Sequence, residues 1–481
     1  METIANYIDG RLAPPLGGRY LENFEPATGQ IYSRVPASQQ QDIEAAVAAA
    51  EAAFSPWSRS TTDERAKMLS CLADALEARL DEFARAETID NGKPLSLARS
   101  LDIPRVVVNL RFFASAITQF ASESHTMGEQ GFNYTLRQPL GAVACISPWN
   151  LPLYLFTWKI APALAAGNTV VAKPSELTPM SAYLFSKLCI DIGLPPGVLN
   201  IVHGVGGEAG QALVEHPGIR AVSFTGGTAT GEKIAAAVGP RFKRISLELG
   251  GKNPTIVFAD CDRKKMLDAV IRSAFWNQGE VCLSGSRIFV ERPYYQEFKD
   301  ELIHRAQGLT VGDPLEPETQ QGALVSQAHL QKVLSYIELA QAEGGVLLCG
   351  GEQVRPAGRC QDGWFVKPTL FEGLAYDCRT NQEEIFGPVA TLTPFTDEAE
   401  LLPWVNSTRY GLAASLWSSD INRCHRLARQ IETGVVWVNC WMVRDLRTPF
   451  GGVKQSGVGR EGGLEALRFF TEAKNVCVDI T

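Results

Sequence analysis

The chain has 481 residues, too many for one ordinary hydrophobic core, so we expect two or three domains. Hydrophobic residues make up 45% and charged residues 20%, which is typical of a folded globular protein and excludes a largely disordered chain. Lys and Arg number 45 against 53 Asp and Glu, and the resulting net charge of −8 argues against unaided binding to nucleic acid or to an anionic membrane.

The cysteines and histidines argue against two classes of protein, those held together by disulfides and those that bind a metal. The eleven cysteines are odd in number and form no Cys-x-x-Cys pair, so we expect reduced thiols in a cytoplasmic protein, not a disulfide framework. The six histidines show no metal-ligand spacing, and no metal site is predicted. The N-terminus has no basic region followed by an apolar run, and no long uncharged apolar stretch occurs, so neither a signal peptide nor a membrane span is expected.

The first half of the chain predicts long helices and then alternating strands and helices. Residues 41–85 are Ala-rich and helical in pattern, and a second helix follows Pro104 over 105–122. Short apolar runs bounded by Gly and Pro come next. The predicted strands cover 142–146, 169–172, 199–202 and 221–224, and the helices after them 152–166, 179–192, 208–215 and 230–238. This alternation favours a parallel, doubly wound sheet that ends near Gly251.

A second α/β series begins at Pro254 and ends near Gly434. Its first predicted elements alternate between strand and helix, at 255–258, 262–276, 287–291 and 294–307. The closing stretch 472–480 contains Val476-Cys477-Val478, which predicts a last strand.

Three segments carry residues suited to nucleophilic catalysis. Cys282 lies in a loop between a helix and a strand, where a thiol can face a cleft. Glu248 stands in an apolar run before Gly250-Gly251, and burial suits a carboxylate to general-base work. Asn150, in Pro148-Trp149-Asn150-Leu151-Pro152, has an amide able to donate to an oxyanion. Each residue alone has a plainer interpretation: a buried cysteine, a solvated acid and a turn asparagine.

Two glycine-rich segments compete as the phosphate-binding loop. Gly226-Gly227 follows a predicted strand and precedes a helix, which places backbone N–H groups near a phosphate. Gly204-Val205-Gly206-Gly207-Glu208-Ala209 fits the Gly-x-Gly-x-x-Ala fingerprint, but the next strand does not end in the acid that this fingerprint needs. We therefore favour Gly226-Gly227 and set the second segment aside.

Taken in order, these segments closely resemble the aldehyde dehydrogenase superfamily over essentially the whole chain. Lys173-Pro174-Ser175-Glu176, Glu383-Glu384-Ile385-Phe386-Gly387-Pro388 and the motifs between Pro449 and Glu461 extend the resemblance. It implies an α/β fold with a Rossmann-like NAD-binding domain, an α/β catalytic domain and a small β oligomerisation arm. The implied boundaries are 1–125 and 144–251 for the NAD domain, 252–434 for the catalytic domain, 126–143 and 466–481 for the arm, and 435–465 for a returning segment that lines the active site.

The resemblance also implies roles for individual residues. Cys282 matches the nucleophile, Asn150 the oxyanion donor together with the Cys282 N–H, and Glu248 the base for hydrolysis; Lys159 and Glu461 match positions used in proton relay and site support. The residues implied to contact the NAD cofactor are Ser147, Trp149, Lys173, Ser175, Glu176, Gly226, Gly227, Leu249, Glu384 and Phe386. Gly227 stands where the family usually has Ser. A carboxylate at Glu176 would repel a 2′-phosphate, which favours NAD over NADP.

Two arginines indicate the kind of aldehyde. A guanidinium pairs bidentately with a carboxylate, so Arg105 and Arg444, if they converge, would select an aldehyde that carries an acid group. Both segments resemble the branch of the family that oxidises 2-aminomuconate and 2-hydroxymuconate semialdehydes, in which these positions bind the substrate carboxylate and Asn150 also contacts the 2-substituent. The plainer interpretation is that both arginines are structural or surface residues.

Three functions are therefore weighed. The first is NAD-dependent oxidation of a muconic-type semialdehyde by a homodimer or homotetramer. The second keeps the enzyme class but assigns an aliphatic, retinal-like or other ω-semialdehyde. The third is a non-catalytic protein that kept the fold; the presence of Cys282 and Glu248 argues against it, and Glu248 also argues against a coenzyme A-acylating enzyme.

Overall fold

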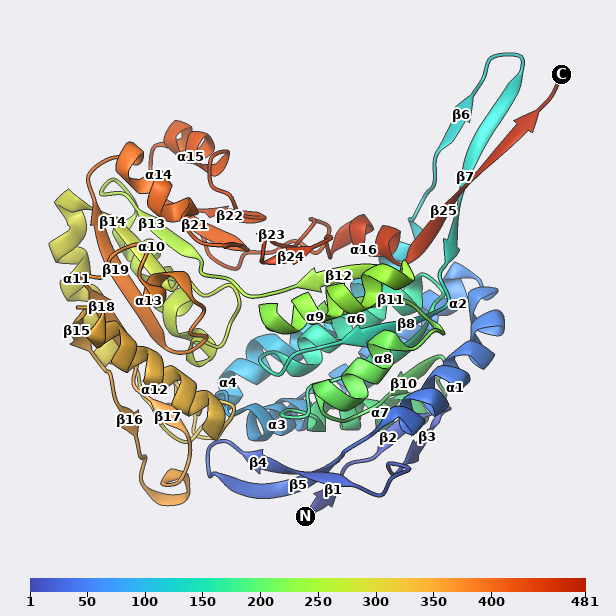
Figure 1. Cartoon of the computed structure of the whole chain (residues 1–481), viewed down its shortest axis with the longest axis horizontal. Coiled ribbons are helices and arrows are strands. Elements are labelled where there is room, and N and C mark those ends of the chain that lie inside the picture. Colours follow the sequence, from blue (N-terminus) through green and yellow to red (C-terminus); the bar gives the residue numbers. More distant parts are fainter.

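The computed structural model describes all 481 residues. An eight-stranded sheet organises the first part of the chain, and its strands lie in the order β24-β12-β11-β8-β9-β10-β2-β3 (Figure 1). Its five central strands are parallel, and each is largely buried because helices cover both faces of the sheet. The strands are β12 (Arg244–Glu248), β11 (Ile219–Thr225), β8 (Ala142–Ile146), β9 (Thr169–Lys173), β10 (Leu199–Ile201) and the antiparallel edges β24 (Gly457–Val458), β2 (Asn6–Ile8) and β3 (Arg11–Ala13).

The region expected to be helical over 41–85 consists of three helices. The break between the first two helices is marked by Thr61, whose hydroxyl caps the start of the second helix. The Glu64 carboxylate in turn accepts a hydrogen bond from the Thr61 N–H at 2.8 Å. The helices of this part are α1 (Gln40–Ser58), α2 (Thr62–Glu77), α3 (Leu80–Asn91), α4 (Leu95–Leu97), the π-helix η1 (Ala98–Asp102), α5 (Ile103–Thr118), α6 (Pro152–Ala165), α7 (Met180–Asp191), the π-helix η2 (Gly206–Gly210), α8 (Gln211–Glu215), α9 (Thr228–Val238) and the short η3 (Gly239–Arg241).

A seven-stranded sheet organises the second part, in the order β15-β18-β19-β14-β13-β21-β22. Its strands are β13 (Pro254–Val257), β14 (Arg287–Glu291), β15 (Val346–Cys349), β18 (Thr369–Glu372), β19 (Val389–Phe395), β21 (Ala413–Trp417) and β22 (Val435–Val438). Its helices are α10 (Arg263–Phe275), η4 (Trp276–Gly279), α11 (Arg292–Gln307), α12 (Gln327–Ala342), η5 (Gly358–Cys360), α13 (Arg379–Gln382), α14 (Glu398–Asn406) and α15 (Ile421–Ala428).

The returning C-terminal segment is shared between the two sheets, which differs from the boundary expected at Gly434. β22 lies beyond that residue, yet it pairs in parallel with β21 and completes the second sheet. β24 then crosses back and pairs antiparallel with β12, opposite Glu248. A strand belongs to the sheet with which its backbone hydrogen bonds, so no single cut in the sequence separates the two parts.

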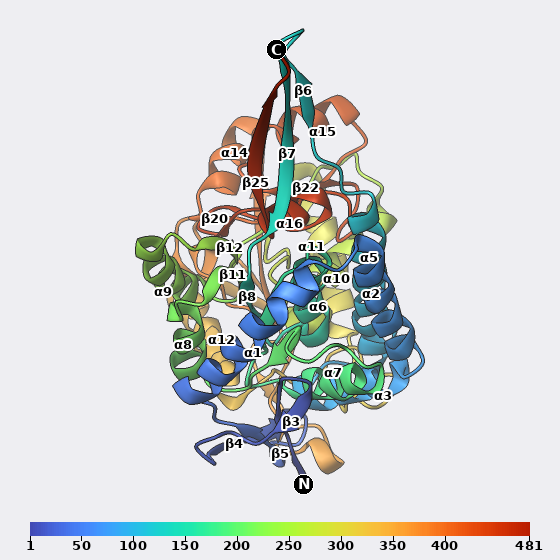
Figure 2. The same cartoon turned by 90° about the vertical axis from the view of Figure 1, so that its right-hand side faces the viewer.

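A three-stranded arm projects from the body of the molecule (Figures 1 and 2). It consists of β6 (Ser124–Thr126), β7 (Gly131–Pro139) and β25 (Thr471–Asp479), with β7 in the middle. The arm is shorter than the expected 126–143 and 466–481, because residues 142–143 belong to β8 and the helix α16 (Gly463–Phe469) precedes β25. Small sheets complete the fold: β1 (Glu2–Thr3) with β5 (Gln30–Pro36) and β4 (Tyr20–Glu25), β16 (Gln353–Val354) with β17 (Phe365–Val366), and β20 (Tyr410–Gly411) with β23 (Val453–Lys454). No helix combines the length and apolar character required to cross a membrane.

Candidate active site

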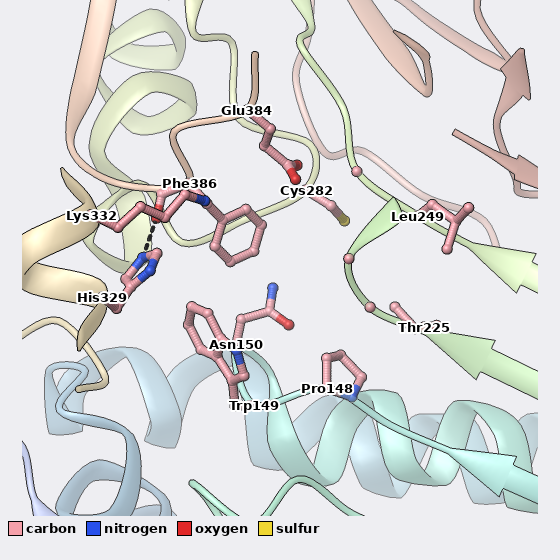
Figure 3. Close-up of a pocket in the computed structure, with 13 residues that line it drawn as sticks. Pro148, Trp149, Asn150, Thr225, Leu249, Cys282, His329, Lys332, Glu384 and Phe386 are labelled. Atoms are coloured by element: carbon pink, nitrogen blue, oxygen red, sulfur yellow. Dashed lines mark hydrogen bonds between the residues drawn. The ribbon is translucent and has the colours of Figure 1, made fainter. Parts of the chain in front are cut away.

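The candidate active site lies where the central strands of the first sheet end. The register places Thr225 opposite Glu248, and Phe224 opposite Ile146, so the loops after β11, β12 and β8 leave the same edge side by side. Ligands in open α/β sheets bind at this carboxyl edge. A cavity of about 270 Å³ opens there and faces the second sheet (Figure 3). It is lined by Pro148, Trp149, Asn150, Thr225, Gly226, Gly227, Leu249, Gly250, Cys282, His329, Lys332, Glu384 and Phe386.

The loop that presents Cys282 has an unusual backbone. Asn277, Gln278 and Gly279 all have positive φ, between 51° and 69°, which turns the chain sharply at the end of α10. A side chain at Gly279 would come within 2.1 Å of the Gly387 carbonyl oxygen, so only glycine fits there. Buried amides stabilise the strained turn: Asn277 Nδ2 donates to the Glu280 carbonyl at 3.2 Å, and Gln278 Nε2 to the Ala323 carbonyl at 3.3 Å. The loop therefore holds the thiol at one position in the cavity.

The environment of Cys282 favours its protonated thiol form. Burial and the nearby carboxylates of Glu384 and Glu248 raise its pKa to about 12, and the Arg444 guanidinium acts in the opposite direction. The Cys282 N–H donates to no carbonyl of the protein, whereas its carbonyl accepts from Asn253 Nδ2 at 2.7 Å. The main chain at Cys282 is thus anchored through the carbonyl oxygen, and the Cys282 N–H remains available to donate a hydrogen bond to a ligand.

Asn150 lines the same cavity as Cys282 (Figure 3). It is 3% exposed and lies in the loop between β8 and α6. Its Nδ2 donates to the Glu280 carbonyl at 3.0 Å, two residues before Cys282, so the amide is directed at the Cys282 loop. Such an amide is suited to stabilise a negative oxygen that develops beside the sulfur.

Glu248 lies behind the cavity and is not part of its lining. Both carboxyl oxygens are buried and have no hydrogen-bond partner, and burial together with Glu461 raises the pKa well above its ordinary value. Glu461 itself accepts from Lys159 Nζ at 2.6 Å and from Ser223 Oγ at 3.2 Å. The structure therefore brings the predicted supporting pair Lys159–Glu461 together, close to Glu248.

Aromatic rings and two residues absent from the sequence prediction form the opposite wall. Trp149 packs edge-on against Phe386 and His329, each at 5.2 Å between ring centroids, and His329 Nε2 lies 2.7 Å from the Phe386 carbonyl oxygen (Figure 3). Lys332, one turn further along α12, attracts Glu384, whose carboxylate accepts from the Gly251 N–H at 2.8 Å. No local motif marks His329 or Lys332, because only the packing of α12 brings them to the cavity.

A second cavity, of about 370 Å³, lies along the same sheet edge beside Lys173. Lys173 Nζ is 3.3 Å from the Glu176 carboxylate, and Ser175 Oγ accepts from the Leu177 N–H at 3.3 Å. Gly206, Gly207 and Gly210 line this cavity, so the glycine segment that we set aside does contribute to a pocket, although it forms a π-helix and not the fingerprint turn. Side chains at Gly206 or Gly207 would meet open space.

These two cavities fit an extended dinucleotide. Three of the buried hydroxyls that have no partner within the protein lie after or at the ends of these strands and in the helix that follows: Ser147 after β8, Thr225 at the end of β11 and Thr228 in the first turn of α9. Gly227 precedes α9, and the Thr228 and Ala229 N–H groups at the start of that helix donate to no carbonyl. Unpaired hydroxyls and helix N–H groups between two cavities are the groups that a pyrophosphate and its riboses require.

Arg105 and Arg444 converge on an open pocket of about 690 Å³ between α5 and residues 443–446. Both contact Tyr154: the Arg105 guanidinium lies 5.5 Å from the ring centroid, and Arg444 Nη1 donates to the hydroxyl at 3.2 Å. Burial and the charge of Arg444 lower the pKa of Arg105. Neither arginine makes an ion pair, and Nε and Nη2 of Arg105 are buried without a partner.

Comparisons with known proteins agree with this site. Residues 15–476 match the aldehyde dehydrogenase family. The chain is 49% identical over 478 residues to a 2-aminomuconic semialdehyde dehydrogenase of Danio rerio, which covers 99% of this chain and 98% of that protein. It is 46% identical over 486 residues to a 2-hydroxymuconic semialdehyde dehydrogenase of Pseudomonas sp. strain CF600, with both chains covered in full. The NAD⁺ complex of an aldehyde dehydrogenase from Bacillus cereus superposes with a TM-score of 0.97 at 40% identity, covering 100% of this chain and 97% of that one.

Proposed function

The chain belongs to the aldehyde dehydrogenase family, and we propose that it oxidises a semialdehyde bearing a carboxylate, of the 2-aminomuconic or 2-hydroxymuconic type, to the dicarboxylic acid with NAD. The observation that carries the substrate class is the pair Arg105 and Arg444, two cations that line one pocket and make no ion pair with the protein; Asp445, which lines the same pocket, pairs with Arg447. Like charges held together in a half-buried pocket are favourable only with an anion between them.

The residues around the cavity divide the chemistry among them. The Cys282 sulfur adds to the aldehyde carbon, and its proton leaves to solvent or to a carboxylate. Asn150 Nδ2 and the Cys282 N–H then donate to the oxyanion of the thiohemiacetal. Bound NAD supplies the hydride acceptor, and loss of hydride from the carbon leaves a thioester on Cys282. Glu248 accepts a proton from the water that attacks this thioester, which releases the acid and restores the thiol.

We propose that the cofactor extends over both cavities. Trp149, Leu249, Glu384 and Phe386 would surround the nicotinamide ribose and ring, and Ser147, Gly226 and Gly227 would face the pyrophosphate. Lys173, Ser175 and Glu176 would contact the adenosine ribose, beside the second cavity. The Glu176 carboxylate would repel a 2′-phosphate, so NAD is the expected cofactor and NADP a poor one.

The test is steady-state kinetics with 2-hydroxymuconate semialdehyde beside hexanal, a neutral aldehyde, using the wild type and the variants Arg105→Ala and Arg444→Ala. Each variant should lose about 10- to 100-fold in kcat/KM for the acid-bearing substrate, the range of a lost charge-assisted hydrogen bond, and less than about threefold for hexanal. Arg59→Ala is the control, because Arg59 lies exposed at the end of α1 and does not line this pocket. Equal losses on both substrates would remove the substrate assignment and favour a broad-specificity enzyme.

The arm and the cysteines support two further assignments. We propose a homodimer or homotetramer, since the arm leaves β6 and β25 as unpaired edges that extend from the body. We also propose a cytoplasmic location, for which the support is that all eleven cysteines are free thiols.

A further inference from the structure

Lys93 is the most deeply buried cation beneath the candidate active site, and the mechanism above does not use it. It follows Gly92, which ends α3 with a φ of 90°, and its side chain is 0% exposed. Its ammonium donates to the Asp102 carboxylate and, at 2.9 Å, to the main-chain oxygen of Asn150, and Glu87 Oε1 lies 3.6 Å away. The buried charge is therefore paired with two carboxylates and held by two hydrogen bonds.

The contact to Asn150 is the informative one. The Asn150 carbonyl accepts from two buried side chains, Lys93 Nζ and Asn277 Nδ2, the latter at 3.2 Å. Asn277 belongs to the strained turn before Cys282 and also donates to the Glu280 carbonyl, the same oxygen that Asn150 Nδ2 contacts. The backbone and the side chain of Asn150 are therefore both tied to the nucleophile loop, with Lys93 fixing the peptide from the other side.

The end of α3 holds the rest of the Asn150 loop as well. Asn91 Nδ2 donates to the Trp149 carbonyl at 2.9 Å, and Glu87 Oε2 accepts from the Leu153 N–H at 3.2 Å. Asp102, the main anchor of Lys93, is the last residue of the π-helix η1, and Arg105 follows it in the first turn of α5. One buried ion cluster thus connects the loop of the oxyanion donor with the helix that carries a substrate arginine.

We infer that Lys93 is a positioning residue for the oxyanion donor: by holding the Asn150 main-chain oxygen, it directs the Asn150 amide at the carbonyl oxygen of the aldehyde attached to Cys282. The inference rests on the proposed role of Asn150. The donor gains catalytic effect from being held in place before the charge develops, and a free loop would lose that advantage. Lys93 itself touches neither substrate nor cofactor.

The experiment is a double-mutant cycle on the full-length enzyme with Lys93→Met and Asn150→Ala, measured with hexanal so that it does not depend on the acid-bearing substrate. In the wild-type background, Lys93→Met should lower kcat about 10- to 100-fold, with the Kd of NAD changed less than about threefold. In the Asn150→Ala background, Lys93→Met should lower kcat less than about threefold, because the amide that Lys93 directs is already absent. Lys67→Met, at an exposed position of α2, is the control and should leave kcat unchanged.

Two results would overturn the inference: a folded Lys93→Met enzyme with wild-type kcat, or an equal loss in both backgrounds, which would indicate a general structural role. Should Lys93→Met fail to fold, Asp102→Asn keeps the shape of the cluster while weakening the anchor of the ammonium, and the same cycle is run with it. The substrate proposal is tested separately, by the ratio of kcat/KM for the acid-bearing aldehyde to kcat/KM for the neutral aldehyde in the wild type. It fails if the wild type does not prefer the acid-bearing aldehyde.

Discussion

At the scale of single residues, the environment of Cys282, the proposed nucleophile, favours the thiol over the reactive thiolate. Burial and the carboxylates of Glu384 and Glu248 raise the pKa of Cys282, and the Arg444 guanidinium and the backbone N–H of Cys282 act in the opposite direction. A thiol reacts as its thiolate, so the resting enzyme keeps little of the reactive form at neutral pH. The position of Cys282 in the cavity, and not a lowered pKa, is what distinguishes it from the ten other cysteines.

The first prediction concerns the pH dependence of this thiol. Because the pKa of Cys282 is raised to about 12, its alkylation by iodoacetamide should accelerate throughout pH 7–10 without reaching a plateau. Glu384→Gln removes one of the carboxylates that raise the pKa, so it should increase the alkylation rate at a given pH several-fold. The measurement is the rate constant against pH with Cys282→Ser as the blank; a plateau below pH 8 in the unliganded wild type contradicts the prediction.

At the scale of secondary-structure elements, strand ends assemble the first half of the site. The parallel register of β8, β11 and β12 brings Asn150, Gly226 and Glu248 to one edge, although about 100 residues separate the first from the last. Strand–helix alternation in the sequence predicted a parallel sheet that contains β8 and β11, but it did not predict β12, the strand that ends in Glu248. It did not predict α12, which supplies His329 and Lys332 from the other sheet.

The second prediction concerns the ion pair that joins α6 to the returning C-terminal segment. Lys159 Nζ and Glu461 Oε1 are 2.6 Å apart, with the two side chains only 1% and 9% exposed. Lys159→Met leaves a buried carboxylate without its cation, which should lower the free energy of unfolding by about 3–5 kcal/mol. The double variant Lys159→Met/Glu461→Leu should recover most of that loss, since it removes the unpaired charge as well.

Thermal melting of the wild type, the single variant and the double variant checks this pair. The single variant should melt several degrees below the wild type and the double variant close to it. A single variant that melts with the wild type would show that water or Ser223 compensates Glu461 without the lysine.

At the scale of the whole molecule, residues from both parts of the chain line the cavity. The arm extends away from the two sheets (Figures 1 and 2). β25 pairs with β7 along nine residues, so the C-terminus and residues 131–139 form one extended ribbon. Phe132 and Leu136 lie on the same face of β7 and are 37% and 39% exposed. An exposed apolar face on a projecting ribbon is typical of a subunit contact.

The third prediction tests that contact. Phe132→Lys/Leu136→Lys places two charges on the exposed face of β7, which should convert much of the proposed homo-oligomer into a species of smaller molar mass, measured by light scattering after gel filtration. The Lys67→Met variant serves again as the control on an exposed helix. An unchanged molar mass would show that this face of the arm takes no part in assembly.

The sequence by itself determined the class of fold and nominated the chemical residues, because both depend on local patterns: alternating strands and helices, a cysteine in a loop, an acid before a Gly-Gly turn and an asparagine before a helix-starting proline. Family membership over residues 15–476 confirms the family and the class of fold, and the roles of the individual residues stay predictions. Tertiary structure alone decided which distant residues meet. β22 and β24 divide the returning segment between two sheets, α12 closes the cavity, and Lys93 reaches the Asn150 carbonyl from a separate helix end. Such contacts depend on packing and on the pairing of buried charges, which leave no periodic signal along the chain.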